Sequence, residues 1–370
     1  MVNRERMVSE FVKLVQIDSL SLQERHMADT LKSILGQMGL DVYEDGAAKN
    51  IGGNAGNLIC TIKGTKNVPA VLFLAHMDTV TPGKGKKAVV DGNIIRTDGT
   101  TVLGGDDVAG IVCILEALRV IKENNIEHGD IQVVFTVAEE CGLLGAKNLD
   151  YSKIYAKYGF VMDNGGPIGT VAVDAPSQNQ IDVVITGKAA HAGVEPEKGI
   201  SAIQIAASAI SGMKLGRIDE ETTANIGVIN GGQATNIICD KVVIKGEARS
   251  RNEQKLREQT EHMKKCFLDA AKQYGGAVDF KYEMVYPSFK VDESDDIISV
   301  ARKAADDIGI ELKLEATGGG SDTNIISGKG IKAVDVSVGM NKVHSVEEQI
   351  CIDDMVKAAE FIISIIKNMK

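Results

Sequence analysis

Strand-like and helical runs alternate along most of the chain, and this alternation most limits how the chain can fold. From the N-terminus to about residue 175, the pattern predicts strands over 58–62, 71–75, 131–138 and 159–162, and a helix over 110–122. The alternation returns near the C-terminus, with a helix predicted over 294–308, a strand over 333–338 and a helix over 353–368. It predicts a layered α/β domain with a mixed central sheet.

The intervening segment has a different order of elements. Strands are predicted over 179–187, 222–229, 239–248 and 277–286, and helices over 199–214 and 252–274. The order βαββαβ is that of a ferredoxin-like sandwich. We therefore predict a catalytic domain made of residues 1–176 and 288–370, with an inserted lid domain at 177–287. A chain of 370 residues is long enough for two such cores.

The lid offers a strand edge that could pair with its copy, so we expect a homodimer through the lid. Hinges near Ala175-Pro176 and Tyr286-Pro287 would let the lid close on a substrate.

The charge balance and the apolar runs exclude several classes of partner. With 41 Lys+Arg against 51 Asp+Glu, the net charge of −10 repels nucleic acid and anionic lipid, so we expect neither as a partner. The longest apolar stretches, 68–75 and 361–366, are far shorter than the roughly 20 residues of a spanning helix. The N-terminal pattern is amphipathic and not a signal core, so we expect a cytoplasmic protein.

The six cysteines are scattered without a CxxC motif, which is typical of reduced thiols and excludes a cysteine-based zinc site.

Imidazole and carboxylate side chains recur just after predicted strands or at the start of a helix. The motifs are His76-Met-Asp78, Gly104-Gly-Asp-Asp107, Glu139-Glu140, Asp163-Asn-Gly and Lys342-Val-His344. The carboxyl ends of strands in an open α/β sheet line one crevice, so these groups can meet there. Each motif alone is weak, because a lone histidine or an acidic pair is more often an ordinary surface or core feature. Together, two imidazoles and several carboxylates match a zinc ligand set.

Charge balance favours two zinc ions in this crevice. Acids packed together without cations repel one another, which raises their pKa values. Three carboxylates against two divalent cations leave one positive charge, which a bound hydroxide neutralises. Such a pair would bring the pKa of a bound water near neutrality and polarise a scissile carbonyl. We expect two Zn²⁺ as the cofactor, with Co²⁺ or Mn²⁺ as possible substitutes. Either acid of each pair, Asp106-Asp107 or Glu139-Glu140, can chemically serve as a ligand.

The wider motifs resemble those of the zinc peptidase family of peptidase T, glutamate carboxypeptidase and aminoacylase. They are His-Met-Asp, Gly-Gly-Asp-Asp-Val-Ala-Gly, Glu-Glu-x-Gly-x-x-Gly, Met-Asp-Asn-Gly-Gly, Ala-His-Ala-Gly and a late Gly-Gly-Ser-Asp-Thr-Asn. The likeness runs in order from about residue 5 to the C-terminus, and it is greatest to peptidase T-like proteins. It implies hydrolysis of the N-terminal peptide bond of short peptides by a bridging water.

The resemblance also implies a role for each metal-binding position. It makes His76 and Asp163 ligands of one zinc, Glu140 and His344 ligands of the other, and Asp106 the bridge. An aspartate at the position of Asp163 goes with aminopeptidases in relatives, whereas a glutamate goes with carboxypeptidases and deacylases. The resemblance therefore favours a substrate with a free amino terminus.

Residues beside the ligands receive their roles in the same way. Glu139 becomes the general base, and Asp78 would accept the imidazole N–H of His76 and fix its tautomer. The resemblance further implies a cis peptide between Asp106 and Asp107. Relatives often have lysine at the next position, where this chain has Val108; we expect only a packing consequence.

Candidate substrate-binding residues lie mainly on the lid. His191, in Ala-His-Ala-Gly, matches a histidine that stabilises the oxyanion in relatives, sometimes from the partner subunit; the alternative is an ordinary loop histidine. Arg249 matches an arginine that clamps the substrate carboxylate, and Arg251 is a competing candidate. Asn236 would hydrogen-bond substrate or serve only as a turn residue.

The glycine-rich segment 318–320 and the serine after it could line the substrate pocket. Gly320 and Ser321 are the candidates there, although such bends can also be plain turns.

Two other functions remain open at this point. One is a metal-dependent N-deacylase or amidohydrolase of acylated amino acids, which would keep the metals and change the bond. The other is a catalytically inactive relative that uses the fold for binding, but such proteins normally lose ligands or the base, and none is missing here.

Overall fold

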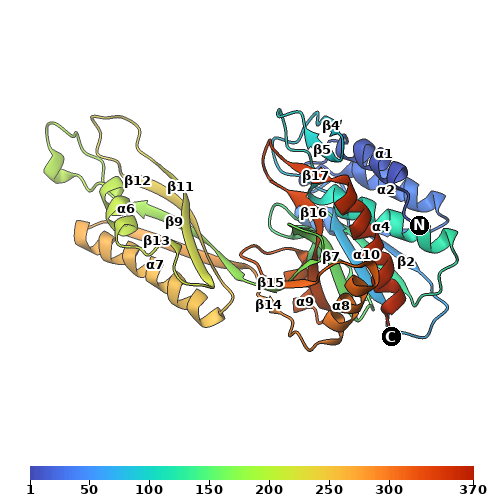
Figure 1. The fold of residues 1–370 in the computed structure, drawn as a ribbon. Helices are drawn as coiled ribbons and strands as arrows, with labels where there is room; N and C mark the ends of the chain where they lie inside the picture. The colour runs from blue at the N-terminus through green and yellow to red at the C-terminus, as the bar shows by residue number, and fades with distance from the viewer. The chain divides into compact units, whose positions relative to one another are not determined.

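The structure, a computed structural model, describes residues 1–370 and divides into two compact units (Figure 1). Unit 1 consists of residues 1–173, 290–316 and 321–370. Unit 2 consists of residues 174–289 and 317–320. Unit 1 is thus assembled from both ends of the chain, and unit 2 comes mainly from its middle.

Unit 1 is built on a twelve-stranded sheet. Its strands are β1 (Val42–Glu44), β2 (Leu58–Ile62), β3 (Val71–His76), β4 (Ala88–Asp91), β5 (Ile94–Thr97), β6 (Ile131–Thr136), β7 (Tyr158–Gly165), β8 (Thr170–Ala175), β14 (Phe289–Lys290), β15 (Lys313–Ala316), β16 (Lys332–Asn341) and β17 (Gln349–Cys351). The main path runs β1-β2-β6-β3-β7-β16-β17-β5-β4, while β14 and β15 pair with β8, which pairs with β16.

Four parallel strands form the centre of this sheet. The neighbours β6, β3, β7 and β16 run in one direction, and the strands on either side, β2 and β17, are antiparallel to them. Every residue of β3 and β6 is buried, as expected for apolar parallel strands that are covered on both faces. The predicted mixed central sheet is therefore confirmed.

Helices cover the sheet of unit 1. They are α1 (Arg4–Val15), α2 (Arg25–Gln37), α3 (Ala47–Ile51), α4 (Gly105–Glu123), α5 (Leu144–Lys147), the 3-10 helix η1 (Tyr151–Lys153), α8 (Asp296–Ile308), α9 (Asp322–Gly328) and α10 (Ile352–Asn368). The apolar helix α4 packs on β3, β7 and β16, and is itself covered by α1 and α10. In α9, Ile326 packs in a cluster with Leu72, Val161 and Ala333 of the parallel strands.

Unit 2 confirms the predicted ferredoxin-like order and adds one very short strand. Its elements are β9 (Ser177–Thr186), the 3-10 helix η2 (Pro196–Lys198), α6 (Ala202–Ser211), β10 (Gly216–Arg217), β11 (Thr222–Gly231), β12 (Lys241–Ser250), α7 (Glu253–Tyr274) and β13 (Ala277–Tyr286). The antiparallel sheet has the order β10-β11-β12-β9-β13. Alternate residues of β9 are buried, and Ile181, Val183 and Phe267 belong to the core shared with α6 and α7.

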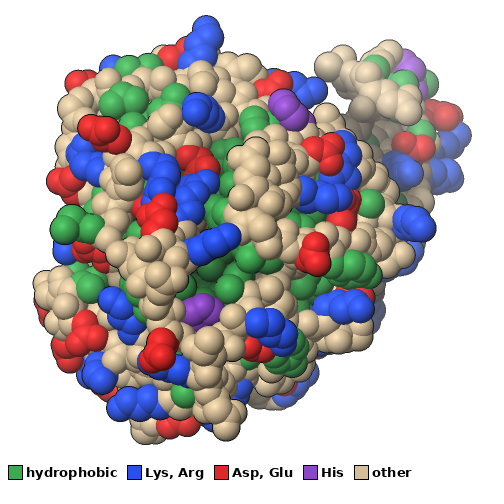
Figure 2. All heavy atoms as spheres, turned by 90° about the vertical axis from the view of Figure 1, so that its right-hand side faces the viewer, with side chains coloured by type: hydrophobic (Ala, Val, Ile, Leu, Met, Phe, Trp, Pro, Cys, Tyr) green, Lys and Arg blue, Asp and Glu red, His purple; other side chains and the backbone are tan.

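The surface charges, the helix lengths and the cysteines have the features of an ordinary globular protein. Figure 2 shows acidic and basic side chains interspersed on one face, without a broad area of one sign. None of the helices combines the length and the apolar character needed to cross a bilayer. All six cysteines are free thiols.

Candidate metal centre

The four central strands bring the predicted ligands to one edge of the sheet. Strand β3 ends at His76, β6 is followed by Glu140, Asp163 lies near the end of β7, and His344 follows β16. Because these strands are parallel neighbours, their carboxyl ends meet at the same edge. Asp106 joins them from the start of α4.

The carboxylate of Asp106 lies between two imidazoles. Its Oδ1 is 2.9 Å from His76 Nε2, and its Oδ2 is 3.2 Å from His344 Nε2. A second carboxylate faces each imidazole: Asp163 Oδ1 lies 3.5 Å from His76 Nε2, and Glu140 Oε1 lies 2.8 Å from His344 Nε2. The structure therefore forms two histidine–carboxylate clusters that share one aspartate.

The donor set fits a pair of divalent cations. Nitrogen and oxygen donors of His76, Asp106 and Glu140 lie within 4.8 Å of one another, as do those of His76, Glu139 and Asp163. These carboxylates are largely buried, and their ion pairs involve only imidazoles, not lysine or arginine. Two imidazoles and several carboxylates are ligands that zinc accepts, and buried carboxylates need cations to offset their repulsion.

The acids around the two imidazoles favour positive charge at this site. Hydrogen bonds to Asp106 and Glu140 raise the pKa of His344 to about 10. Burial opposes protonation of His76, but Asp163 and Asp106 outweigh it and raise the pKa of this imidazole. Burial favours the neutral acid of Asp106, yet the two imidazoles lower its pKa. The site is therefore arranged for positive charge on both sides of Asp106.

The side chain of Asp163 is directed into the site by a register shift between β7 and β16. The pairing of β7 with β16 shifts register between Asp335 and Ser337, where Val161 and Asn164 are the successive partners, so Asp163 lies in a bulge. A bulge redirects a side chain that a regular strand would point elsewhere. The backbone N–H of Asp163 donates to Asp335 Oδ1 at 3.2 Å.

Glu139 lies beside the two clusters on the turn after β6. It is 7 % exposed, and burial raises its pKa, with further contributions from Asp163 and Asp322. The residue before it, Ala138, has a positive φ of 51°, which turns the chain sharply at this point. A carboxylate with a raised pKa at this position can accept a proton and return it.

Asp78 holds the turn that carries the two glutamates. Its Oδ1 accepts the backbone N–H of Glu139 at 2.9 Å, and its Oδ2 accepts that of Glu140 at 3.2 Å. The Ser21 hydroxyl also donates to Oδ2, at 2.6 Å. His76 Nδ1, the partner expected from the sequence, lies 3.5 Å from Oδ1 and makes no hydrogen bond in the structure.

Further carboxylates hold the backbone of the site; the sequence had offered Asp107 only as an alternative ligand, and it had not indicated Glu24 or Asp335. Asp107 Oδ2 accepts the backbone N–H of His76 at 3.2 Å, and Glu24 Oε1 accepts that of Ala138 at 3.0 Å. Asp335 holds Asp163 in the same way. The one available signal was Asp335 itself, an acid in the middle of the apolar strand β16. The peptide between Asp106 and Asp107 is cis, which confirms the expectation from the resemblance.

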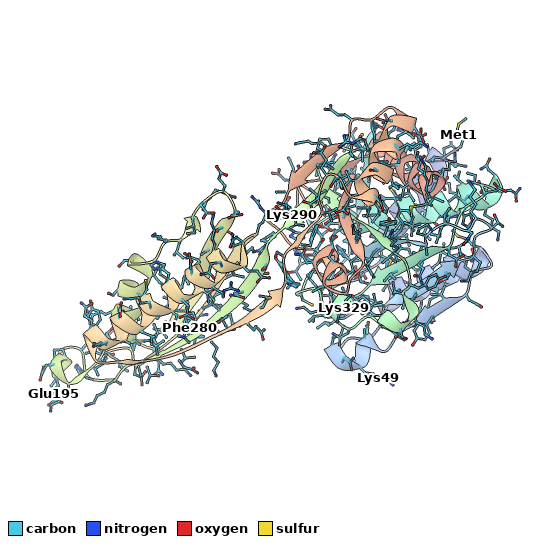
Figure 3. All side chains as sticks on the ribbon, turned by 90° about the horizontal axis from the view of Figure 1, so that it is seen from below. Met1, Lys49, Glu195, Phe280, Lys290 and Lys329 are labelled. Carbon is cyan, nitrogen blue, oxygen red and sulfur yellow. The ribbon has the colours of Figure 1, made fainter.

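Two of the predicted substrate residues lie on neighbouring loops of unit 2. His191 and Asn236 are both exposed. The loops are joined by a β-bridge between His191 and Ile237, and the backbone N–H of Ala192 donates to the carbonyl of Asn236 at 2.9 Å. Glu195, in the same loop as His191, marks one tip of unit 2 in Figure 3.

The two candidate arginines already have partners within unit 2. The Nε and Nη2 of Arg249 donate to the carboxylate of Glu247 at 3.1 and 3.0 Å, and its Nη1 donates to the carbonyl of Gly318 at 3.4 Å. Arg251 lies 3.6 Å from Asp174 Oδ2 and donates to the carbonyl of Glu220 at 3.2 Å. A ligand that binds Arg249 must therefore use its remaining N–H groups or displace Glu247.

The remaining two candidates are engaged in packing and capping. A Cβ on Gly320 would lie 2.3 Å from the Tyr286 ring, so only glycine fits against that ring. Ser321 is the N-cap of α9: its hydroxyl accepts the N–H of Thr323, and its own N–H donates to Asn324 Oδ1.

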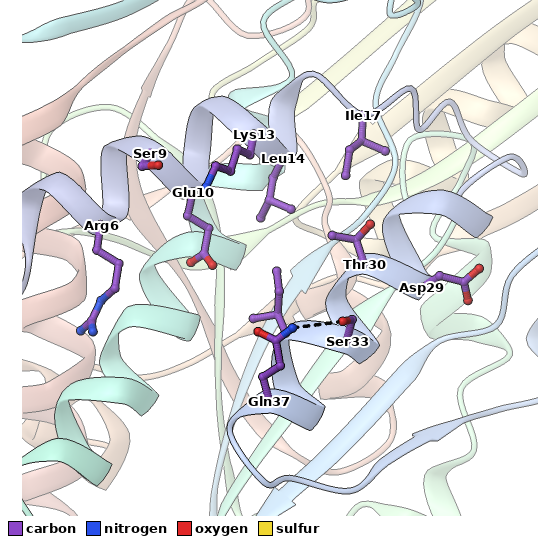
Figure 4. A pocket seen from close by; sticks show the side chains of 11 residues that line it. Arg6, Ser9, Glu10, Lys13, Leu14, Ile17, Asp29, Thr30, Ser33 and Gln37 are labelled. Atoms are coloured by element: carbon purple, nitrogen blue, oxygen red, sulfur yellow. Dashed lines mark hydrogen bonds between the residues drawn. The ribbon is translucent and has the colours of Figure 1, made fainter.

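A separate groove of about 610 Å³ lies between α1 and α2 (Figure 4). Its walls include Arg6, Glu10, Lys13, Asp29 and Gln37. None of the motif residues lines this groove, so it does not belong to the candidate site.

Comparisons with known proteins agree with these motifs. The sequence profile of the peptidase family M20/M25/M40 matches residues 72–368. The chain is 50% identical to the uncharacterized protein YqjE of Bacillus subtilis, over 100% of this chain and 99% of that one. It is similar to the solved aminopeptidase PepT of Bacillus cereus, with 47% identity and a TM-score of 0.92 over 100% of this chain and 99% of that one. It is also similar to a solved tripeptidase of Staphylococcus aureus, with 43% identity and a TM-score of 0.96 over 99% of this chain and 98% of that one. The resemblance found in the sequence is thereby confirmed.

Proposed function

The chain belongs to the peptidase family M20/M25/M40 and is a peptidase T-like enzyme, and we propose that it uses two zinc ions to hydrolyse the N-terminal peptide bond of short peptides. The observation that carries this proposal is the shared position of Asp106 between His76 and His344. A carboxylate with one oxygen toward each of two imidazoles is suited to bridge two cations.

The residues proposed to hold the metals divide into two sets. His76 and Asp163 would hold one zinc, Glu140 and His344 the other, and Asp106 both. When bound, the two ions would activate a water molecule and polarise the scissile carbonyl.

The chain's own residues would move the proton. Glu139 would accept a proton from the attacking water and later give it to the leaving amine. Its buried position supports this role, because burial raises the pKa of its carboxyl above the usual range. Asp78 fixes the backbone of Glu139 and so would keep the carboxylate aimed at the reacting atoms.

The substrate is proposed to be a short peptide with a free amino terminus. The names of the two solved relatives, an aminopeptidase and a tripeptidase, support this class, and so does aspartate at position 163. Arg249 is proposed to bind the substrate carboxylate through N–H groups that do not face Glu247, and His191 to stabilise the oxyanion. Asn236, Gly320 and Ser321 are further proposed substrate contacts, and two of them also have structural roles: Gly320 packs against Tyr286, and Ser321 caps α9.

We also propose that the protein acts in the cytoplasm as a homodimer. The amphipathic N-terminal pattern predicts the cytoplasm, and the strand edges of unit 2 predict a homodimer.

One substrate panel tests the proposed reaction. Purified protein loaded with zinc is assayed with a tripeptide, its N-acetylated form, and N-acetyl and N-succinyl amino acids. We expect release of the N-terminal residue from the free tripeptide only, with activity lost to a chelator and restored by zinc or cobalt. Cleavage of the acylated compounds alone would replace this proposal with an N-deacylase.

A further inference from the structure

A buried carboxylate outside the proposed ligand set holds the segment that leads to the bridging aspartate. Glu348 lies in the loop between β16 and β17 and is 2 % exposed. Its Oε2 accepts the backbone N–H groups of Leu103 and Gly104 at 2.7 and 2.9 Å, and its Oε1 accepts that of Asp106 at 3.0 Å. One side chain therefore binds three of the four backbone N–H groups between residues 103 and 106.

These N–H groups need that carboxylate. Leu103, Gly104 and Gly105 are buried, so water cannot replace a lost hydrogen-bond partner without cost. The chain turns at Gly104, where φ is 76°, and its amides converge on Glu348. The contact is also tight, because a Cβ on Gly105 would lie 3.0 Å from Glu348 Oε1. The position of Asp106 thus depends on the position of Glu348.

The same loop carries the second imidazole. His344 is four residues before Glu348, and its Nε2 lies 3.2 Å from Asp106 Oδ2. The loop therefore contacts Asp106 twice. The imidazole of His344 lies beside the Asp106 side chain, and the carboxylate of Glu348 accepts the Asp106 backbone N–H. These two contacts together fix the separation between Asp106 and His344.

We propose that Glu348 is a positioning residue that sets the distance between Asp106 and His344 and thereby the affinity of the cluster containing His344 for its metal ion. This inference rests on the proposed two-metal function. The cluster of His76 depends on Glu348 less, because His76 and Asp163 stand on the central strands β3 and β7, and only Asp106 comes from the segment that Glu348 holds. In the other cluster, both Asp106 and the loop of His344 depend on it.

The test compares Glu348→Gln with Glu347→Gln. A glutamine has the same shape but accepts at one oxygen only, so at least one of the three N–H groups loses its acceptor and faces an NH2 group. Glu347 is the matched control, since it lies next to Glu348 but is exposed, and its carboxylate pairs with Lys342 at 2.7 Å. Zinc binding to metal-free protein is measured by competition with a chromophoric chelator, together with circular dichroism and steady-state kinetics.

For Glu348→Gln we expect a folded protein that binds the second zinc equivalent about 10- to 100-fold more weakly. The affinity for the first equivalent should change far less. Its kcat should fall at limiting zinc and recover in excess zinc at unchanged KM, whereas Glu347→Gln should match the wild type. Equal weakening of both equivalents, or wild-type affinity for both, would overturn the inference.

A second variant covers the case in which Glu348→Gln does not fold. Gly105→Ala keeps the charge of Glu348, but the added methyl group would crowd its carboxylate. This variant should therefore also selectively weaken the binding of the second zinc equivalent. Unchanged zinc affinity in this variant would count against the inference. A wild-type protein that binds fewer than two zinc ions would instead show failure of the proposed function, before either variant is compared.

Discussion

The carboxylate of Asp78 accepts the backbone N–H of Glu139 at 2.9 Å, and this bond links the strand that ends in the first histidine to the proposed general base. Asp78 is fully buried and also holds the next residue, Glu140, which is a proposed ligand. One aspartate therefore orients two adjacent glutamates for which different roles are proposed.

Replacing Asp78 by asparagine should lower kcat/KM by about 10- to 100-fold without unfolding the protein. The amide has one acceptor oxygen, so it cannot hold both backbone N–H groups of Glu139 and Glu140. Steady-state kinetics with a tripeptide measures the effect, and Asp91→Asn, at an exposed position, serves as control. Wild-type kinetics in Asp78→Asn would remove Asp78 from the account.

Glu139→Gln should lower kcat by about 10²- to 10⁴-fold while both metals stay bound, because the amide cannot accept the proton. Glu140→Gln provides the contrast, since loss of a proposed ligand should also lower the metal content. Activity and metal content are measured on the same samples. If Glu139→Gln turned over at the wild-type rate, another group would have to be the base.

Glu24 predicts a dependence of stability on pH. Burial, and then the charge of Asp78, raises the pKa of Glu24 from 4.5 to about 7. Because the folded state holds the proton more tightly, the stabilisation is complete below pH 4.5 and is lost as the pH rises through 7. Glu24→Gln keeps an acceptor for Leu22 and Ala138 and cannot ionise.

The free energy of unfolding of Glu24→Gln, relative to the wild type, should therefore increase by about 2 kcal/mol from pH 5.5 to pH 8. Urea unfolding at the two pH values measures it, and the contribution of bound metal cancels in the difference. The exposed Glu5→Gln should show no such change. An equal difference at both pH values would mean that Glu24 is ionised throughout.

The fold was largely predictable because its central elements have strong local patterns. The buried runs of β3 and β6 and the long apolar helix α4 were recognised from sequence, as was the order of elements in unit 2. Short strands such as β4, β5 and β17 were not, since three or four residues carry too little periodicity. Their pairing depends on partners distant in the chain.

The site was predictable where strand ends and family motifs coincide, as at His76 and Asp163. The carboxylates that hold its backbone were not, because Glu24, Asp335 and Glu348 become adjacent to the candidate site only in the folded chain. The structure also shows why some positions of the motifs must be glycine. A Cβ on Gly110, for example, would lie 2.5 Å from the Met162 carbonyl, so α4 could not approach β7 there.

The proposed clamp for the substrate carboxylate predicts a selective change in binding. Arg249→Lys should raise KM by about 10-fold for a tripeptide with a free C-terminus and leave KM unchanged for its C-terminal amide. Arg257→Lys, on the exposed side of α7, is the matched control. The same increase for both substrates would show that Arg249 does not bind the carboxylate.

The number of zinc ions per chain tests the central claim most directly. Zinc is counted by mass spectrometry after reconstitution and removal of excess metal, in the wild type and in His344→Ala. We predict two ions per chain in the active wild type and one in the variant. A fully active wild type with one ion or none would contradict a bridging role for Asp106.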